Sequence, residues 1–244
     1  MTPGDTTTDT LFGGLLRLTQ PRRGYRFNVD ALWLAEFATR QGRARRVLDL
    51  GAGIGALGLG ASCMTRIECL TCVEQDQQLA ELCRQNLERA AQAGRVLEHD
   101  LARGLPRALH AAFDLVLVNP PYFERGERRA ARPERETARA GSLEPFLRAA
   151  AVALAGPRAR AAFVYPARSL ARFFAGAERH GLVPKRMALL HPFRDQPARL
   201  GLVELRRARP GGLVVEPALA EWERPGVPSA ESARLTARRA TART

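Results

Sequence analysis

Residues 45–55 read RRVLDLGAGIG, and this stretch decides the fold. Residues 45–50 form a short apolar run with branched side chains, which predicts a buried strand. Glycines at alternate positions end the stretch, and residues 56–59 predict a helix. A strand, a glycine turn and a helix in this order let the backbone approach a cofactor closely. Because Ala56 stands where a dinucleotide site has its third glycine, the turn alone does not identify the cofactor.

Strands and helices alternate on both sides of this stretch, which predicts an α/β fold with a mainly parallel sheet and helices on both faces. The expected strands are residues 67–74, 95–98, 113–118, 160–165, 183–190 and 200–205. The expected helices are residues 31–38, 76–90, 143–154 and 169–180. The connector between the last two strands contains two prolines and suits an antiparallel pair at the C-terminal end of the sheet.

The length and composition of the chain predict one domain. A chain of 244 residues with 45% hydrophobic residues can bury one sizeable core. We expect this domain to cover residues 11–223. Residues 1–10 are polar, and residues 224–244 are rich in Pro, Ser, Ala and Arg, so both ends are expected to be disordered.

The charge of the chain indicates a polyanionic partner. The formal net charge is +13, and Lys185 is the single lysine among 38 basic residues. A GC-rich genome explains arginine over lysine, but it does not explain the excess of base over acid. Nucleic acid is therefore the first candidate partner. Residues 124–140, with six arginines and four glutamates, are a candidate substrate loop or simply a solvated surface loop.

Neither a metal site nor a membrane segment is expected. Cys69 and Cys72 have CxxC spacing, but they fall in an expected strand, where an odd separation sends side chains to opposite faces. No second Cys/His cluster completes a zinc site. The sequence has no run of eighteen apolar residues and no signal-peptide pattern at its N-terminus, so a cytoplasmic protein without a membrane span is expected.

A second informative stretch, Asn119-Pro120-Pro121-Tyr122, follows the apolar run 113–118. Two prolines fix two φ angles and remove two N–H donors, so this turn is stiff. The Asn119 side-chain oxygen and the Pro120 carbonyl can each accept one N–H of a planar amine. Tyr122 can stack on the ring that carries the amine. The alternative is an ordinary proline turn at a strand end, but the glycine turn upstream favours an active site.

Two acidic residues stand where neighbouring strands are expected to end. Glu74 ends the second strand and can take both hydroxyls of a ribose. Asp100 follows the third strand, residues 95–98. Open α/β sheets bind ligands at the carboxyl ends of their strands, so both carboxylates are expected at the same edge as the glycine turn.

These motifs resemble the class I S-adenosylmethionine methyltransferases that methylate amino groups. The flanks resemble one branch, the bacterial tRNA(Val) adenine-N6 methyltransferases, in residues 26–31, in Phe123 and in residues 211–217. The similarity covers roughly residues 11–223. It implies a Rossmann-like sheet of seven strands with the last antiparallel, S-adenosylmethionine as cofactor, and an adenine of RNA, first of all tRNA, as substrate.

The resemblance also implies a cofactor site. The glycine turn, with Gly51 and Gly53, would hold the methionine part of the cofactor, and Glu74 its ribose. Asp100 would accept the adenine amine, and Leu101 would supply a backbone N–H. The other residues implied for this site are Phe27 and Asp30, which would help close the pocket, Asp49, which would order the loop, and Asn119.

The catalytic residues implied are Asn119, Pro120 and Tyr122, with Tyr122 and Phe123 stacking on the target base. Accepting the two N–H groups directs the nitrogen lone pair at the methyl group, so orientation and electrostatics supply most of the rate enhancement. The target base must leave its stack to reach the turn.

Four other functions remain open. Release-factor methyltransferases use the same turn on a protein glutamine, but they carry a longer N-terminal helical domain than the roughly 45 residues before strand one here. A DNA-adenine methyltransferase would need a target-recognition domain. A catalytically silent RNA-binding protein would not need the intact Asn119–Tyr122 turn. A nicotinamide dehydrogenase explains Glu74 and leaves that turn unexplained.

Overall fold

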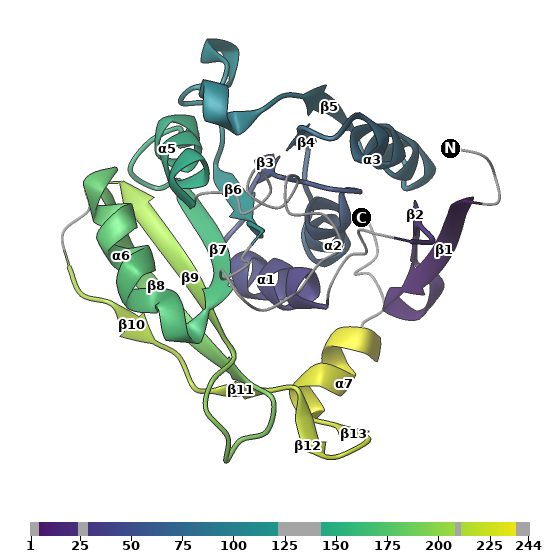
Figure 1. The fold of residues 1–244 in the computed structure, drawn as a ribbon, viewed down its shortest axis with the longest axis vertical. Coiled ribbons are helices and arrows are strands. Elements are labelled where there is room, and N and C mark those ends of the chain that lie inside the picture. The colour runs from purple at the N-terminus through teal and green to yellow at the C-terminus, as the bar shows by residue number, and fades with distance from the viewer. Residues whose placement is uncertain (1–4, 24–28, 122–142, 208–210, 238–244) are drawn as a thin grey trace, which may run out of the picture.

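The computed structural model describes residues 5–23, 29–121, 143–207 and 211–237. The main sheet has nine strands, and seven of them are longer than two residues. Figure 1 shows their arrangement. The seven longer strands are β3 (Arg46–Leu50), β4 (Cys69–Glu74), β5 (Gly94–Glu98), β6 (Leu115–Val118), β7 (Arg160–Pro166), β8 (Leu182–His191) and β9 (Leu200–Arg207). Two strands of two residues each, β10 (Val214–Val215) and β11 (Leu219–Ala220), pair in parallel with β8.

The order of the strands puts β3 at the centre of the sheet. The path is β10-β8-β9-β7-β6-β3-β4-β5, with β11 beside β8. Strands β3 to β7 run parallel, whereas β9 is antiparallel to both β7 and β8. The expected mainly parallel sheet with a C-terminal antiparallel pair is confirmed. Since the parallel strands share one direction, their carboxyl ends meet at one edge, called the carboxyl edge below.

Helices cover both faces of the sheet. Their bounds are α1 (Asp30–Thr39), α2 (Ala56–Met64), α3 (Gln77–Arg89), α5 (Leu143–Ala153) and α6 (Leu170–Arg179). Side chains of α1, α2 and α3 share one buried cluster, and those of α5 and α6 share a second. The strands alternate between the clusters: Val47 joins the first and Leu48 the second. This alternation buries both faces, as the continuous apolar strands require.

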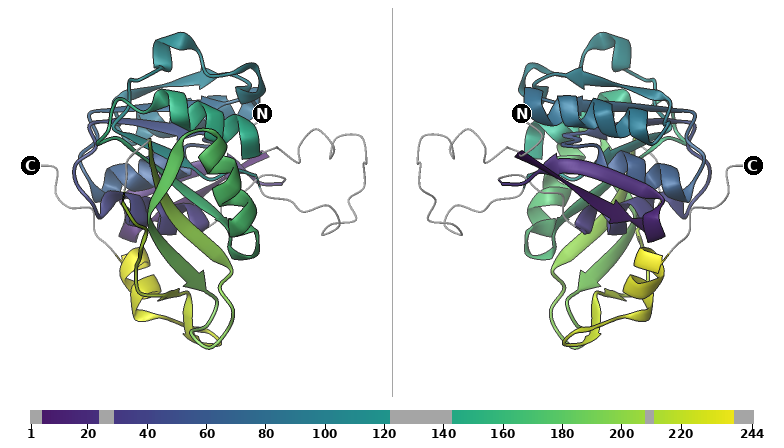
Figure 2. Two further views of the ribbon diagram at one scale, coloured as in Figure 1. Left: turned by 90° about the vertical axis from the view of Figure 1, so that its left-hand side faces the viewer. Right: turned by 90° about the vertical axis from the view of Figure 1, so that its right-hand side faces the viewer.

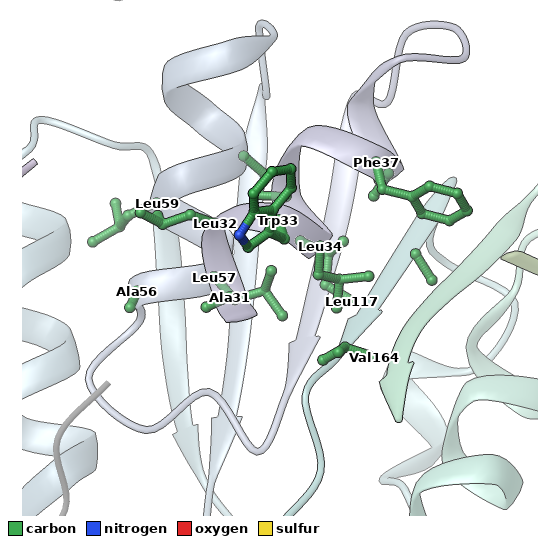
Figure 3. Close-up of a cluster of buried hydrophobic side chains, with 14 of the residues drawn as sticks. Ala31, Leu32, Trp33, Leu34, Phe37, Ala56, Leu57, Leu59, Leu117 and Val164 are labelled. Atoms are coloured by element: carbon green, nitrogen blue, oxygen red, sulfur yellow. The ribbon is translucent and has the colours of Figure 1, made fainter. Parts of the chain in front are cut away.

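Helix α1 packs against α2 on one face of the sheet. Figure 3 shows Ala31 and Leu57 from these helices in one buried cluster with Leu117 and Val164 from the sheet. This packing joins the beginning of α1 to the helix that leaves the glycine turn. No helix within the described ranges is long and apolar enough to cross a membrane.

Residues 5–10 have a defined structure, contrary to the prediction that residues 1–10 are disordered, while residues 1–4 lie outside the described residues. Strands β1 (Thr6–Leu11) and β2 (Leu16–Pro21) form an antiparallel hairpin around a short helix, η2 (Phe12–Gly14). The hairpin lies over the side of the molecule formed by α2 and α3 (Figure 2, right). The sequence of β1 has no apolar pattern, because its threonines pair across the hairpin and do not enter the core. Leu18, fully buried, anchors it.

The prediction that residues 224–244 are disordered is wrong for residues 224–237. Strands β12 (Trp222–Arg224) and β13 (Val227–Pro228) form a small hairpin, and helix α7 (Ala230–Ala237) follows. Leu235 of α7 and Phe12 of η2 belong to the same buried cluster. The domain therefore extends beyond residues 11–223 at both ends, and the two ends of the described chain pack together.

Candidate active site

The glycine turn adopts a backbone that larger residues resist. Gly51 has a φ of +68° and Gly55 a φ of +85°. A Cβ at Gly51 would come within 2.9 Å of the Phe146 ring, and one at Gly55 within 2.8 Å of the Cys83 Sγ. The N–H groups of Gly51 and Ala52 both donate to the Val73 carbonyl, at 2.9 and 3.0 Å. The turn between β3 and α2 is thus fastened to the end of β4.

Glu74 fastens the same turn through its side chain. Its Oε2 accepts a hydrogen bond from the Gly53 N–H at 2.8 Å. Its Oε1 accepts from the N–H groups of Gln75 at 2.8 Å and Asp76 at 2.9 Å. Burial raises the pKa of Glu74, while these backbone hydrogen bonds act in the opposite direction. A carboxylate has about four acceptor positions, so Oε2 retains capacity for a ligand hydroxyl.

Asp49 lies beneath helix α2, with only 1% of its surface exposed. Its Oδ2 accepts a hydrogen bond from the Gly58 N–H at 2.9 Å. Burial raises the pKa of Asp49 to about 7; the Gly58 hydrogen bond lowers it, and the charge of Glu74 raises it. Two carboxylates therefore flank the glycine turn, and a cation bound there would favour their charged forms.

Asp100 and Leu101 stand at the end of β5, close to Glu74. The His99 N–H donates to the Glu74 carbonyl at 2.9 Å, which joins the ends of β4 and β5. Asp100 precedes the short helix η3 (Leu101–Arg103), and its Oδ1 accepts from the Ala102 N–H at 2.8 Å. A carboxylate oxygen accepts more than one hydrogen bond, so Asp100 can accept a further donor. Leu101 is buried.

Asn119 begins the proline turn directly after β6. Val118 pairs with Leu50, so Asn119 and Gly51 each lie one residue beyond a paired position on adjacent strands. Asn119 is half-buried and Pro120 is buried. The structure thus brings Asn119, Gly51 and Glu74 to the carboxyl edge, as their positions in the sequence indicated. Phe27, Tyr122, Phe123 and the loop 124–140 lie outside the described residues.

Asp30, the first residue of α1, has a buried carboxylate that binds an arginine. Its Oδ1 lies 2.6 Å from the Nη2 of Arg199, the residue directly before β9. The same Nη2 lies 2.6 Å from the Oε1 of Glu221. Through Arg199, Asp30 therefore joins α1 to Glu221, which lies between β11 and β12. Its implied role in closing a cofactor pocket stays a prediction.

Asn86 is a residue of this region that the sequence interpretation missed. It lies on α3 with no exposed surface, and its side chain reaches both the hairpin and the glycine turn. One of its N–H groups donates to the Ile54 carbonyl at 3.0 Å. A polar residue on the buried face of an amphipathic helix was the available signal.

A hollow of about 360 Å³ lies away from this site. It is lined by Arg46, Cys69, Gly94 and Arg95 near the starts of β3, β4 and β5, at the opposite edge of the sheet. Across residues 5–23, 29–121, 143–207 and 211–237, no group of three or more His, Cys, Asp or Glu side chains could hold a metal ion. Cys69 is exposed and Cys72 is buried, so they face opposite sides of β4 as expected.

The architecture agrees with known methyltransferases. A predicted O-methyltransferase, Atu636 from Agrobacterium tumefaciens, superimposes with a TM-score of 0.67 at 24% identity, over 87% of this chain and 98% of that one. The 16S rRNA methyltransferase RsmC of T. thermophilus, in complex with AdoMet and guanosine, gives a TM-score of 0.57 at 21% identity, over 83% and 50% of the two chains. The chain has the class I methyltransferase fold.

Comparison with protein sequences points to a more specific group of methyltransferases. The sequence model of the family described as methyltransferase small domain matches residues 29–140. The tRNA1(Val) (adenine(37)-N6)-methyltransferase of Shewanella sp. (strain W3-18-1) is 33% identical over 158 residues, which cover 62% of this chain and 64% of that protein. The match thus spans less than two thirds of the relative. The resemblance that the motifs indicated is confirmed by these relatives.

Proposed function

We propose that the chain is an S-adenosylmethionine-dependent N-methyltransferase that acts on the N6 amine of an adenine in tRNA. The observation that carries the proposal is the position of Asn119, one residue beyond β6 and beside the glycine turn. An amide oxygen at this position can accept a hydrogen bond from an amine that lies next to a bound cofactor. The name of the Shewanella relative supports adenine N6 as the target. Such an enzyme works in the cytoplasm, where tRNA is found.

The residues of the carboxyl edge fit S-adenosylmethionine. Glu74 retains acceptor capacity for ribose hydroxyls, and Asp100 has a carboxylate oxygen for the adenine amine. Gly51 and Gly53 would hold the methionine part of the cofactor, and Leu101 would supply a backbone N–H to its adenine. The two buried carboxylates Asp49 and Glu74 suit a cationic ligand, since a positive charge offsets the cost of their burial. When bound, the cofactor supplies an electrophilic methyl group on a positively charged sulfur.

The chain's own part in the reaction is to orient the amine. The adenine amine is a weak nucleophile because its lone pair is delocalised into the ring. The Asn119 amide oxygen and the Pro120 carbonyl would each accept one N–H, which draws the nitrogen toward a tetrahedral shape. The same oxygens stabilise the positive charge that develops on nitrogen during attack. Tyr122 and Phe123 would hold the base after it leaves its stack.

Two observations support tRNA as the substrate: the positive net charge of the chain and its sequence similarity to a tRNA methyltransferase. The net charge of +13 favours a polyanion, and phosphate contacts by arginine would supply much of the affinity. The arginines of residues 124–140 directly follow the proline turn and are candidates for these contacts. A protein glutamine presents the same planar NH2 group to Asn119, so it is the competing acceptor.

The test is methyl transfer from labelled S-adenosylmethionine to two acceptors, bulk unmodified tRNA and a release factor. The expected result is label in tRNA that is recovered as N6-methyladenosine after digestion, with none in the protein. Label in the release factor alone would assign the turn to glutamine. No transfer to either acceptor, with cofactor binding retained, would indicate a silent RNA-binding protein.

A further inference from the structure

Asn86 connects two segments that are distant in sequence. Its Oδ1 accepts the Thr19 N–H at 2.8 Å, and its Nδ2 donates to the Thr19 carbonyl at 3.0 Å. The second Nδ2 proton is donated to the Ile54 carbonyl, also at 3.0 Å. Thr19 lies on β2 of the N-terminal hairpin, and Ile54 lies in the glycine turn. One buried amide therefore holds both segments on helix α3.

The three contacts fix the orientation of the amide. The Asn86 amide accepts from the N–H of Thr19 and donates to the carbonyl of the same residue. Paired residues of an antiparallel sheet exchange two hydrogen bonds in the same way. Turning the amide over would place its NH2 against the Thr19 N–H and its oxygen against two carbonyls. Because Asn86 has no exposed surface, water cannot replace a lost bond. No other uncharged side chain of this size offers one acceptor and two donors.

The hairpin has a second polar contact with α3, and this one does not reach the glycine turn. Arg89, one helical turn beyond Asn86, donates from Nη1 to the Thr19 Oγ1. Both residues fasten β2 to α3, but it is the side chain of Asn86 that also bonds to Ile54 in the glycine turn. The pair therefore separates docking of the hairpin from support of the turn.

We propose that Asn86 is a positioning residue for the cofactor, which rests on the proposed function: it holds the Ile54 carbonyl and couples the glycine turn to the N-terminal hairpin. The turn carries glycines at positive φ, which have many alternative conformations when they are not held. Glu74 fastens the turn at Gly53, and Asn86 fastens it one residue later. Without Asn86 a smaller fraction of molecules has the binding conformation, and the apparent Kd rises in inverse proportion to that fraction.

The first test measures the affinity of Asn86→Ala and of Arg89→Ala for S-adenosylmethionine by calorimetry, together with the Tm of each. Asn86→Ala is expected to raise the Kd on the order of tenfold, as loss of a buried hydrogen bond implies. Arg89→Ala is expected to stay within about twofold of wild type, because its part-buried bond to Thr19 does not touch the turn and Asn86 still holds both Thr19 and Ile54. At saturating cofactor, kcat of Asn86→Ala is expected to remain near wild type.

Equal Kd values for Asn86→Ala and wild type, with a lower Tm, would overturn the proposal and leave Asn86 a purely structural residue. A wild-type chain that binds no cofactor would instead contradict the proposed function. The two failures are therefore distinguishable.

A second test uses the wild-type chain, so it does not depend on whether Asn86→Ala folds. Coupling is reciprocal: if the hairpin stabilises the turn, a ligand on the turn must stabilise the hairpin. Hydrogen exchange of residues 16–21 is expected to slow when S-adenosylmethionine is added, whereas exchange of β12 and β13 is expected to stay constant. Unchanged exchange in residues 16–21 at saturating cofactor would overturn the coupling.

Discussion

The two halves of the carboxyl edge are held by different chemistry. Around β3 and β4, the side chains of Asp49, Glu74 and Asn86 bond to backbone groups of the glycine turn and the helix that follows it. Around β8 and β9, arginines bridge acids: Arg199 binds Asp30 and Glu221. The first kind of contact shapes a backbone, whereas the second joins whole segments. We therefore expect mutations around β3 and β4 to change the affinity for ligand, and mutations around β8 and β9 to change the free energy of unfolding.

The arginine half has a buried centre at Arg186. Its Nη2 donates to the Phe37 carbonyl at 2.7 Å and lies 3.2 Å from the Oε2 of Glu204, while Nη1 reaches Glu216 at 2.8 Å. The guanidinium also lies 3.8 Å above the Phe37 ring. These contacts join β8, β9 and the segment between β10 and β11 to α1.

The largest effect is expected for Arg186→Met. Glu204 keeps Arg206 as a partner at 2.8 Å, but it loses the buried guanidinium at its Oε2, and the Phe37 carbonyl loses its donor. Breaking buried contacts of this kind should lower the free energy of unfolding by about 3–5 kcal/mol. Chemical denaturation measures this loss. The Kd of the folded variant for S-adenosylmethionine should stay within about twofold of wild type. If the fully folded variant bound S-adenosylmethionine much more weakly than wild type, the assignment of this region to stability alone would be contradicted.

Asn119→Ala is expected to affect chemistry alone. The amide oxygen acts on the amine as charge develops, so kcat should fall on the order of 100-fold or more while cofactor affinity is unchanged. Single-turnover kinetics with saturating cofactor and tRNA measure this step. Near wild-type kcat would remove Asn119 from the catalytic residues.

Glu74→Ala, in the region around β3 and β4, should lower the affinity for S-adenosylmethionine with little change in fold. It removes the acceptor for the Gly53 N–H and the expected acceptor for ribose, so binding of S-adenosylmethionine should lose about 1.5–3 kcal/mol. Calorimetry gives the Kd, and Glu221→Gln in the arginine half serves as the matched control with an expected Kd close to wild type. Equal Kd values for Glu74→Ala and wild type would place the ribose elsewhere.

The smallest effect concerns pH. The pKa of Asp49 is raised to about 7 in the folded chain, against about 3.9 when unfolded. Its ionisation therefore disfavours folding, so its contribution to stability falls as pH rises from about 4 to about 7 and stays constant above. A bound cation favours the charged carboxylate, so cofactor affinity should rise several-fold from pH 6 to pH 8. Asp49→Asn should reduce that rise, and an identical pH profile would contradict this account of Asp49.

The sequence predicted the glycine turn, the acids at strand ends and the proline turn because each depends on local chemistry. An apolar strand followed by glycine or proline places the next side chain at the carboxyl edge, whatever the rest of the chain does. Contacts between distant residues left no such signal. The ion pair of Asp30 with Arg199 spans 169 residues, and the bond from Asn86 to Thr19 spans 67.

The ends of the chain were harder to predict for a related reason. The β1–β2 hairpin is rich in threonine, and α7 is short and contains Ala, Ser and Arg, so both have weak apolar periodicity. Their order comes from a few anchors, Leu18 in β2 and Leu235 in α7, which are buried only because the rest of the fold offers a surface. Tertiary packing, and not local propensity, determines both elements.

The most direct measurement of the central claim is the nucleoside content of tRNA from cells that lack this chain. Digestion and mass spectrometry should show that one N6-methyladenosine is missing, that the wild-type chain restores it, and that Asn119→Ala, expressed at the same level, does not. An unchanged nucleoside profile in the deleted strain, or full restoration by Asn119→Ala, would contradict adenine N6 methylation by this site.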